Sequence, residues 1–211
     1  MTTNQTVGHV FLVDDNDDMR TYLGMTLRQM GYSLSAYASA DDFLENSVDI
    51  SPAVLLLDMR MPGKNGSELQ MRLQQLGRKT PIVFISGDAD RDEIIDAFVH
   101  GAIDFLWKPF SHERLHEAIE KALQRDRLVS QKMTALHRLK ISFDSLSPRE
   151  QELFFLMADG LTNKAIASLK DIQPGTVKKH RSTIYGKLGI SRTSELILLC
   201  KGQNLEDLRK H

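Results

Sequence analysis

The sequence predicts an α/β domain, built on a doubly wound parallel sheet, followed by a smaller all-α domain. Short apolar runs in the first half alternate with helix-like stretches, which is typical of buried parallel strands in such a sheet. Each run also ends directly before a side chain that is suited to chemistry. In the second half, helix start and stop signals follow one another closely, as in a small helical domain.

The strands are expected at four apolar runs. The runs, with the residues that follow them, are 9–13 with Asp14 and Asp15, 53–57 with Asp58, 82–85 with Ser86, and 104–107 with Lys108. Because the carboxyl ends of parallel strands gather at one edge, where ligands bind, we expect these side chains to meet. An acidic pair at one strand end is often only a turn or a helix cap. Four strand ends of this kind favour a functional cluster.

The chemistry open to this cluster follows from its charges. Crowded carboxylates repel one another unless a hard cation neutralises them, and Mg²⁺ prefers one or two carboxylates together with waters and phosphate oxygens. A divalent metal is therefore implied. One aspartate can then attack a phosphoryl group and form an aspartyl phosphate, while Lys108 and Ser86 bind the phosphoryl oxygens.

Residues 111–140 contain neither Gly nor Pro and are rich in helix formers, so the last helix of the α/β domain is expected to continue as a linker. Its apolar residues follow steps of four and three, with one polar interruption at Asp126. Up to Leu123 we expect this stripe to pack on the domain's own sheet. Beyond it, Val129, Met133 and Leu136 form a candidate seam between two protomers.

The all-α domain begins with a capping box, Ser147 to Glu150, that has Pro at the first helical position. Thr162 caps a second helix, Pro174 opens a third, and Gly189 ends it. The three helices are expected at 148–160, 163–170 and 175–188. On the third, Val177, Ile184 and Leu188 form an inward stripe; the opposite face carries Lys178, Lys179, Ser182 and, near its edge, Arg181. Such a face fits a recognition helix in the major groove of DNA.

The charge distribution agrees with two domains that have different partners. The net charge of the chain is −1, but residues 1–110 contain 9 Lys and Arg against 16 Asp and Glu, whereas residues 111–211 contain 18 against 12. A basic half is what a polyanion would select, although a solvated helical surface can show the same balance.

Residues 7 to about 125 resemble the receiver domain of bacterial two-component response regulators, with its flavodoxin-like, five-stranded fold. The matching pieces are LVDDN (12–16), LLLDMRMPGKNG (55–66), FISG (84–87) and FLWKPF (105–110). The resemblance implies that Asp58 is the phosphoacceptor. It also implies a Mg²⁺ (or Mn²⁺) site made by Asp14, Asp15, Asp58 and the backbone carbonyl of Arg60. Ser86 would be the switch hydroxyl, Lys108 the phosphate-binding lysine, Phe105 the switch aromatic, and Lys108-Pro109 a cis peptide.

Residues 145 to 200 resemble the LuxR-type DNA-binding domain, through LSPREQELFFLMADGLTNKAIA and TVKKHRSTIYGKLGI. The whole chain is thus similar to the FixJ/NarL class of transcriptional regulators. The resemblance assigns DNA contacts to Thr176, Lys178, Lys179, His180, Arg181 and Ser182, with His180 and Arg181 near the backbone. Gln173 stands where the family usually has a small hydroxyl cap, and Ser182 offers a shorter arm than Lys or Asn.

We therefore expect a receiver domain at 1–125, a helical linker at 126–143 and a four-helix, helix-turn-helix DNA-binding domain at 144–211. Phosphorylation of Asp58 would change dimer or interdomain contacts and so control the binding of two recognition helices to DNA. The expected partners are double-stranded DNA, a sensor histidine kinase, a second copy of the chain and RNA polymerase. Apart from phosphorylation and dephosphorylation of Asp58 itself, no enzymatic activity is expected.

Two other functions fit parts of the sequence. A phosphohydrolase with an aspartyl-phosphate intermediate would use the same residues, but haloacid dehalogenase-like enzymes have a second Asp where Arg60 stands here. A receiver joined to a protein- or RNA-binding helical module is the other. No apolar stretch approaches the roughly 18 residues of a membrane span, and the N-terminus lacks a signal pattern, so a soluble, cytoplasmic protein is expected. Cys200, the single cysteine, is expected to be a buried small hydrophobe.

Overall fold

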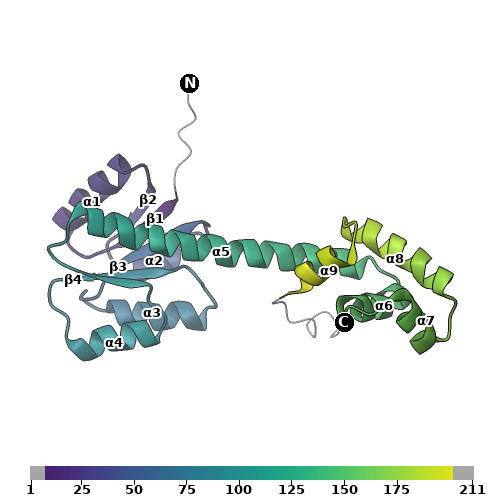
Figure 1. Cartoon of the computed structure of the whole chain (residues 1–211). Coiled ribbons are helices and arrows are strands. Elements are labelled where there is room, and N and C mark those ends of the chain that lie inside the picture. Colours follow the sequence, from purple (N-terminus) through teal and green to yellow (C-terminus); the bar gives the residue numbers. More distant parts are fainter. Residues whose placement is uncertain (1–7, 202–211) are drawn as a thin grey trace, which may run out of the picture. The chain divides into compact units, whose positions relative to one another are not determined.

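A computed structural model describes residues 8–201, and contacts divide the chain into two compact units that meet between Ser130 and Gln131. The first unit contains one sheet. Its strands are β1 (His9–Val13), β2 (Ser33–Tyr37), β3 (Ala53–Asp58), β4 (Ile82–Ser86) and β5 (Asp104–Trp107). All neighbours pair in parallel, in the order β2-β1-β3-β4-β5 (Figure 1). The predicted doubly wound parallel sheet is confirmed.

The strand β2 has no apolar run, and its position was expected only through the five-stranded resemblance. Its sequence, SLSAY, mixes polar and apolar residues, and most of its side chains are half-buried. The reason is its place at the edge, where it pairs with β1 alone. A strand at an edge escapes the two-sided burial that makes the central strands continuously apolar.

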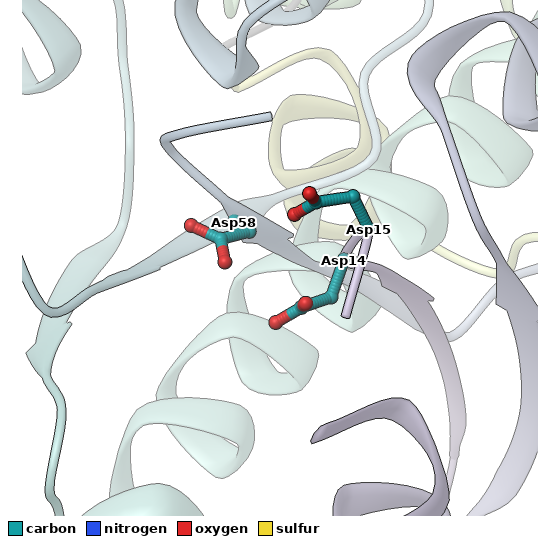
Figure 2. Close-up of side chains that lie close together, drawn as sticks. All are labelled: Asp14, Asp15 and Asp58. Carbon is teal, nitrogen blue, oxygen red and sulfur yellow. The ribbon is translucent and has the colours of Figure 1, made fainter. Parts of the chain in front are cut away.

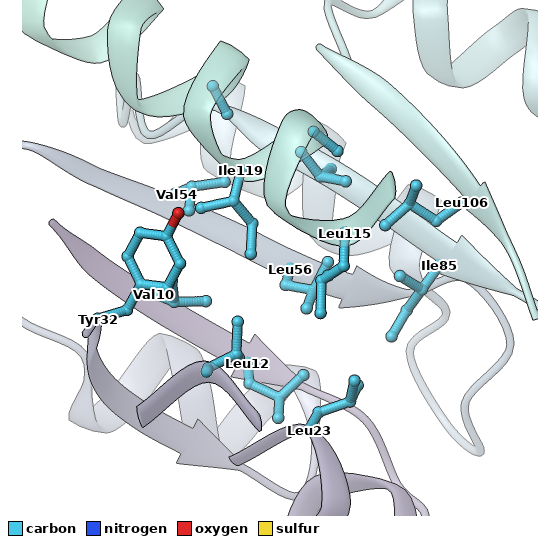
Figure 3. Close-up of a cluster of buried hydrophobic side chains, with 14 of the residues drawn as sticks. Val10, Leu12, Leu23, Tyr32, Val54, Leu56, Ile85, Leu106, Leu115 and Ile119 are labelled. Carbon is cyan, nitrogen blue, oxygen red and sulfur yellow. The ribbon is translucent and has the colours of Figure 1, made fainter. Parts of the chain in front are cut away.

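Five helices follow the strands of this unit. They are α1 (Asp17–Gln29), α2 (Ala40–Asn46), α3 (Gly66–Gln75), α4 (Arg91–Val99) and α5 (His112–Asp144). One apolar core joins α1 and α5 to one face of the sheet, and a second joins α2, α3 and α4 to the other. Figure 3 shows the first core, with Leu115 and Ile119 of α5 set against strand residues that include Val54 and Leu56. Helices on both faces leave the carboxyl edge of the sheet as the open place for a site.

The helix α5 confirms the predicted continuation of the last receiver helix, because it runs for 33 residues without a break. The side chains of Leu115, Ile119 and Leu123 are fully buried, so the first part of the stripe packs on the domain's own sheet as expected. Asp126, the polar interruption, is also buried. Its Oδ2 accepts a hydrogen bond from the backbone N–H of Ala53 at a distance of 2.9 Å. Asp126 therefore holds α5 to the first residue of β3.

The second unit has a helical core of its own. Its helices are α6 (Pro148–Ala158), α7 (Asn163–Lys170), α8 (Pro174–Leu188) and α9 (Thr193–Cys200), and its core includes Leu139 and Phe143 from the end of α5. The capping box between Ser147 and Glu150 is formed as predicted. Gln173 makes no side-chain cap, which agrees with its departure from the family pattern.

Cys200 is buried, as expected, and burial raises the pKa of its thiol to about 11, with a smaller contribution from the charge of Asp159. Among residues 8–201, no helix is both long enough and apolar enough to cross a membrane.

Candidate functional site

Three carboxylates lie together at the carboxyl edge of the sheet, as Figure 2 shows. Asp14 and Asp15 follow the last residue of β1, and Asp58 ends β3, the strand beside it. One oxygen from each lies within 4.8 Å of the other two. Asp14 and Asp58 are buried, whereas Asp15 is exposed. The strand ends thus bring together the three aspartates that the sequence placed in one cluster.

Gly66 keeps the other side of this site compact. A Cβ at this position would lie 2.5 Å from the carbonyl oxygen of Asp58, closer than any side chain can approach a backbone atom. Since Gly66 is also the first residue of α3, the lack of a side chain lets α3 begin directly against the end of β3.

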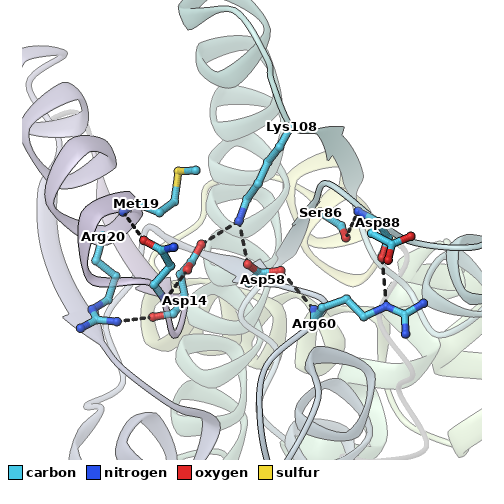
Figure 4. A network of polar contacts seen from close by, with 9 residues as sticks. Asp14, Met19, Arg20, Asp58, Arg60, Ser86, Asp88 and Lys108 are labelled. Carbon is cyan, nitrogen blue, oxygen red and sulfur yellow. Dashed lines mark hydrogen bonds and ion pairs between the residues drawn. The ribbon is translucent and has the colours of Figure 1, made fainter.

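Lys108 provides the positive charge in the pocket. Its Nζ donates to Asp58 Oδ2 at 2.6 Å and to Asp14 Oδ2 at 2.9 Å (Figure 4). The other oxygens of the two carboxylates accept backbone N–H groups: Asn16 donates to Asp14 Oδ1, and Arg60 donates to Asp58 Oδ1. One lysine and two amide donors therefore hold two buried carboxylates in place.

The pKa values of both Asp58 and Lys108 are raised, for different reasons. Burial raises the pKa of Asp58, and the neighbouring Asp14 adds to it; the hydrogen bonds from Lys108 and from the Arg60 amide offset only part of this rise. For Lys108, burial lowers the pKa, but the hydrogen bonds and charges of Asp58 and Asp14 outweigh it, so the pKa rises. Lys108 thus stays protonated, while the ionised form of Asp58 remains costly.

The donor set suits a hard divalent cation. The three carboxylates lie together, and Lys108 pairs with two of them, Asp14 and Asp58, so a net negative charge remains among oxygen ligands. Mg²⁺ favours oxygen ligands of this kind and keeps several of its waters. The residues present therefore fit the metal that the sequence implied.

Ser86 ends the neighbouring strand β4 and is buried. Its Oγ accepts the backbone N–H of Asp88 at 3.1 Å, and its carbonyl accepts the N–H of Lys108 at 2.8 Å. The backbone hydrogen bond connects the strand ends that carry Ser86 and Lys108, and the peptide bond from Lys108 to Pro109 is cis. Ser86 thus ends the strand directly beside that of Asp58, and Lys108 follows β5, the next strand beyond it.

In the second unit, α8 has one solvent-facing side with two lysines. Thr176, Lys178, Lys179 and Ser182 are exposed, whereas His180 and Arg181 are half-buried. Val177 and Ile184 are buried and Leu188 is half-buried, so the predicted inward stripe is confirmed. The exposed side of α8 thus presents the positive charges of Lys178 and Lys179 to solvent.

Comparison with known proteins accounts for both units. Residues 10–120 match the response regulator receiver domain, and residues 144–200 match the bacterial regulatory proteins of the luxR family. The chain belongs to the response regulators.

Relatives of this response regulator span most of its length. It is 36% identical over 188 residues to the response regulator protein TmoT of Ectopseudomonas mendocina, covering 89% of this chain and 86% of that protein. It is 32% identical over 194 residues to the transcriptional regulatory protein FixJ of Bradyrhizobium diazoefficiens, covering 92% of this chain and 95% of that protein.

Solved structures give the same result. The structure of response regulator StyR is similar with a TM-score of 0.80 and 38% identity, covering 93% of this chain and 99% of that one. Full-length FixJ is similar with a TM-score of 0.59 and 32% identity, covering 93% and 97%. The response regulator thus has a receiver domain and a LuxR-type DNA-binding domain, and it is a transcriptional regulator of the two-component type rather than a classical enzyme. The alternatives of a phosphohydrolase and of an RNA- or protein-binding module have no support.

In the receiver domain, Phe105 lies on β5 and is partly buried. Its ring meets the ring of Trp107 edge-on, with 5.2 Å between the centroids. Trp107 is half-exposed. A change in the rotamer of Phe105 would therefore alter the surroundings of the tryptophan. The role of Phe105 as a switch stays a prediction.

The side chain of Arg60 makes contacts that the sequence did not predict, since the resemblance implied only its backbone carbonyl as a ligand. The Nε of Arg60 donates to the carbonyl oxygen of Asp88 at 2.9 Å (Figure 4). The Nη2 of Arg60 lies 2.9 Å from Glu93 Oε2. Glu93 also closes the capping box that begins α4 at Asp90. The D-x-x-E pattern at residues 90–93 predicts that box, but nothing in the sequence pairs it with Arg60. The carbonyl of Arg60 as a metal ligand stays a prediction.

In the DNA-binding domain, Arg181 differs from the other predicted contacts. Its Nη1 donates to Thr193 Oγ1 at 2.7 Å, and its Nη2 donates to the carbonyl oxygen of Leu161 at 3.1 Å. The guanidinium is thus bonded within the domain. The phosphate contact of Arg181 stays a prediction, and the structure shows the guanidinium engaged by these two acceptors instead.

Proposed function

We propose that Asp58 of this response regulator accepts a phosphoryl group from a sensor histidine kinase and that the phosphorylated receiver controls binding to double-stranded DNA. The single observation that carries the proposal is the position of the Lys108 ammonium. It touches Asp58 and Asp14 at once, in a pocket whose three carboxylates come from two adjacent strands. Once Asp58 carries a phosphoryl group, such a lysine can bind a phosphoryl oxygen in place of the Asp58 carboxylate oxygen.

The carboxylates of Asp14, Asp15 and Asp58, with the backbone carbonyl of Arg60, would hold Mg²⁺ or Mn²⁺. When bound, the metal supplies charge neutralisation for the phosphoryl oxygens. An oxygen of Asp58 then forms the new bond to phosphorus, and the bond between phosphorus and the donor breaks, with the electron pair leaving on the donor. Lys108 and the hydroxyl of Ser86 bind the transferred oxygens, and Phe105 reports the change to the neighbouring strand face.

The exposed side of α8 is the proposed DNA-reading surface. Thr176, Lys178, Lys179 and Ser182 would face the groove, and half-buried His180 would lie near the backbone. We also propose that the phosphorylated protein forms a homodimer and contacts RNA polymerase, and that it is located in the cytoplasm. The proposed domains are the receiver at 1–125, the linker at 126–143 and the DNA-binding domain at 144–211.

The test is phosphorylation by acetyl phosphate, a small donor that needs no kinase. The wild-type chain should gain one phosphoryl group only when Mg²⁺ is present, and Asp58→Asn should gain none. Asp88→Asn, which removes an exposed acid beside the pocket, is the matched control and should be labelled like the wild type. Stoichiometric labelling of Asp58→Asn, or labelling in excess chelator, would overturn the assignment.

A further inference from the structure

Arg181 is half-buried at the border between the inward stripe and the exposed side of α8. At about 100° per residue, Arg181 lies only about 40° around the helix axis from buried Val177, and Ile184 and Leu188 lie within about 60° of it. Lys179, at the centre of the exposed side, lies about 160° away from Arg181. The single arginine of this helix therefore lies at the edge of the inward stripe, with exposed Lys178 about 60° away on its other side.

The guanidinium joins three elements. Nη2 bonds to the carbonyl of Leu161, in the turn between α6 and α7, and Nη1 bonds to the hydroxyl of Thr193, the first residue of α9. The same hydroxyl lies 2.6 Å from the hydroxyl of Tyr185, one turn further along α8. The Nε atom is buried and has no hydrogen-bond partner among residues 8–201. Two separate points of α8 are thus tied to the start of α9.

We propose that Arg181 is a positioning residue of the DNA-binding domain: it sets the rotation of α8 about its own axis against the α6–α7 turn and the start of α9, and it does not contact DNA phosphate. The face that Lys179 and Ser182 present to the groove then depends on Arg181 through the helix they share. A rotation of α8 by a fraction of a turn would move Lys179 away from the base edges, although no atom of Arg181 touches them.

This role differs from a phosphate contact in what a lysine can replace. A lysine keeps the charge, which is enough for a phosphate, but its compact ammonium cannot reproduce two donors directed at two separate acceptors. No carboxylate within the described part of the chain forms an ion pair with Arg181, so its charge also adds to the field around the domain. The test must therefore separate charge from geometry.

The experiment uses the full-length chain and two duplexes: one selected from a random pool by the wild-type protein, and one of scrambled sequence. Arg181→Lys and Arg181→Gln should each weaken binding to the selected duplex by about three- to tenfold, the scale of one or two hydrogen bonds. For Arg181→Lys, the slope of log affinity against log salt should match that of the wild type. Thr193→Val, which changes no charge, should produce the same loss, and its combination with Arg181→Lys should be less than additive.

Lys178→Gln is the matched control, because it removes one charge from the exposed side of the same helix. Each phosphate contact contributes about 0.9 to the steepness of the plot of log affinity against log salt. Full affinity in Arg181→Lys, together with a slope lowered by about 0.9 in Arg181→Gln, would overturn the proposal, as would full affinity in Thr193→Val. Circular dichroism and urea unfolding of each variant restrict the comparison to folded protein, and Thr193→Val remains informative if both Arg181 variants unfold.

Discussion

At the scale of single residues, the acidic pocket is a place where the fold holds charge at a cost. Burial raises the pKa of Asp58 despite the nearby Lys108, so the folded chain releases this proton less readily than the unfolded chain does. The raised pKa of Lys108 reflects contacts that stabilise the folded chain rather than destabilise it. Its raised pKa means that its ion pairs favour folding throughout the range below its ordinary pKa and that this contribution is lost as pH rises through the folded-state value.

The raised pKa of Asp58 predicts a stability change. Above the ordinary pKa of aspartate, the folded chain keeps a proton that the unfolded chain has lost, so stability falls as pH rises to the folded-state pKa. Asp58→Asn should remove this dependence and raise the free energy of unfolding at neutral pH without Mg²⁺. Urea unfolding between pH 4 and pH 8 measures it. Asp88→Asn should leave the curve unchanged, and a destabilised Asp58→Asn would contradict the interpretation.

Lys179 predicts a loss of sequence preference. It lies at the centre of the exposed side of α8, where one good base contact discriminates by about 1–3 kcal/mol. Lys179→Ala should therefore bind the selected duplex more weakly while its affinity for a scrambled duplex changes little. Fluorescence anisotropy with both duplexes at two salt concentrations gives the two affinities. An equal loss on both would mean that Lys179 holds the backbone instead.

At the scale of elements, β5 and α5 connect the acidic pocket to the rest of the receiver domain. β5 places Phe105 and Trp107 two residues apart on one face, directly before Lys108. α5 begins a few residues after Lys108, covers the sheet, and is bonded through Asp126 to the amino end of β3, whose carboxyl end is Asp58. The six residues of β3 thus connect the residue that Asp126 holds, Ala53, with Asp58, the proposed phosphoacceptor.

The contact between Phe105 and Trp107 predicts an optical signal. Because the chain has one tryptophan, and it is half-exposed, emission reports this strand face alone. Adding beryllofluoride with Mg²⁺, which mimics the phosphoryl group, should shift the emission of the wild type and leave that of Asp58→Asn unchanged. An unaltered spectrum, in a sample shown by independent means to bind the mimic, would argue that Phe105 does not move.

The later part of α5 predicts a dimer seam. Met133 is more than half exposed and Leu136 is half-buried within their unit, whereas Val129 belongs to the first unit and lines a cavity there. If Met133 and Leu136 pair between protomers, each fully buried side chain contributes about 1.5–3 kcal/mol. Changing both to Glu should then weaken the phosphorylation-dependent dimer by well over tenfold in sedimentation equilibrium.

Gln131→Glu with Thr134→Glu adds the same charges to exposed positions outside the seam and serves as the control. Equal association of the seam variant and the parent would place dimerisation elsewhere, on the receiver faces or near Leu196 to Leu199.

At the scale of the whole molecule, two units of opposite charge balance share one helix. The acidic half holds the cluster of Asp14, Asp15 and Asp58, and the basic half holds α8, the proposed recognition helix. Each unit has its own apolar core, so each can respond to its ligand separately. Regulation then requires that phosphorylation change the free energy of DNA binding, which is a coupling between two sites.

Replacement of Lys108 should abolish the coupling between phosphorylation and DNA binding. Lys108→Ala leaves all three carboxylates in place, so Mg²⁺ should still bind, but the phosphoryl group would lose the ammonium that connects it to the end of β5. Phosphorylation should then no longer raise DNA affinity in an electrophoretic shift assay. Calorimetry with Mg²⁺ confirms that the metal site survives. A phosphorylation-dependent increase equal to that of the wild type would show that the signal leaves the pocket by another route.

Much of this protein is determined by its sequence alone. Central parallel strands must be continuously apolar, and a catalytic side chain at the end of each one has a single edge at which to gather, so Asp14, Asp58, Ser86 and Lys108 could be assigned to one site without coordinates. The helices of the second unit were equally accessible, because caps such as Ser147 and Gly189 act within one turn of the chain.

The tertiary structure alone decided the contacts between residues far apart in sequence. The edge strand β2 has no apolar run, and the partner of Arg60 lies 33 positions away in Glu93. Asp126 breaks the apolar stripe of α5, and only the bond to Ala53 explains why. The sequence placed Arg181 near the edge of the exposed side of α8, and its charge suggested DNA; only the structure shows that its guanidinium bonds to Leu161 and Thr193. Local patterns record burial, whereas the partner that satisfies a buried polar group is chosen by packing.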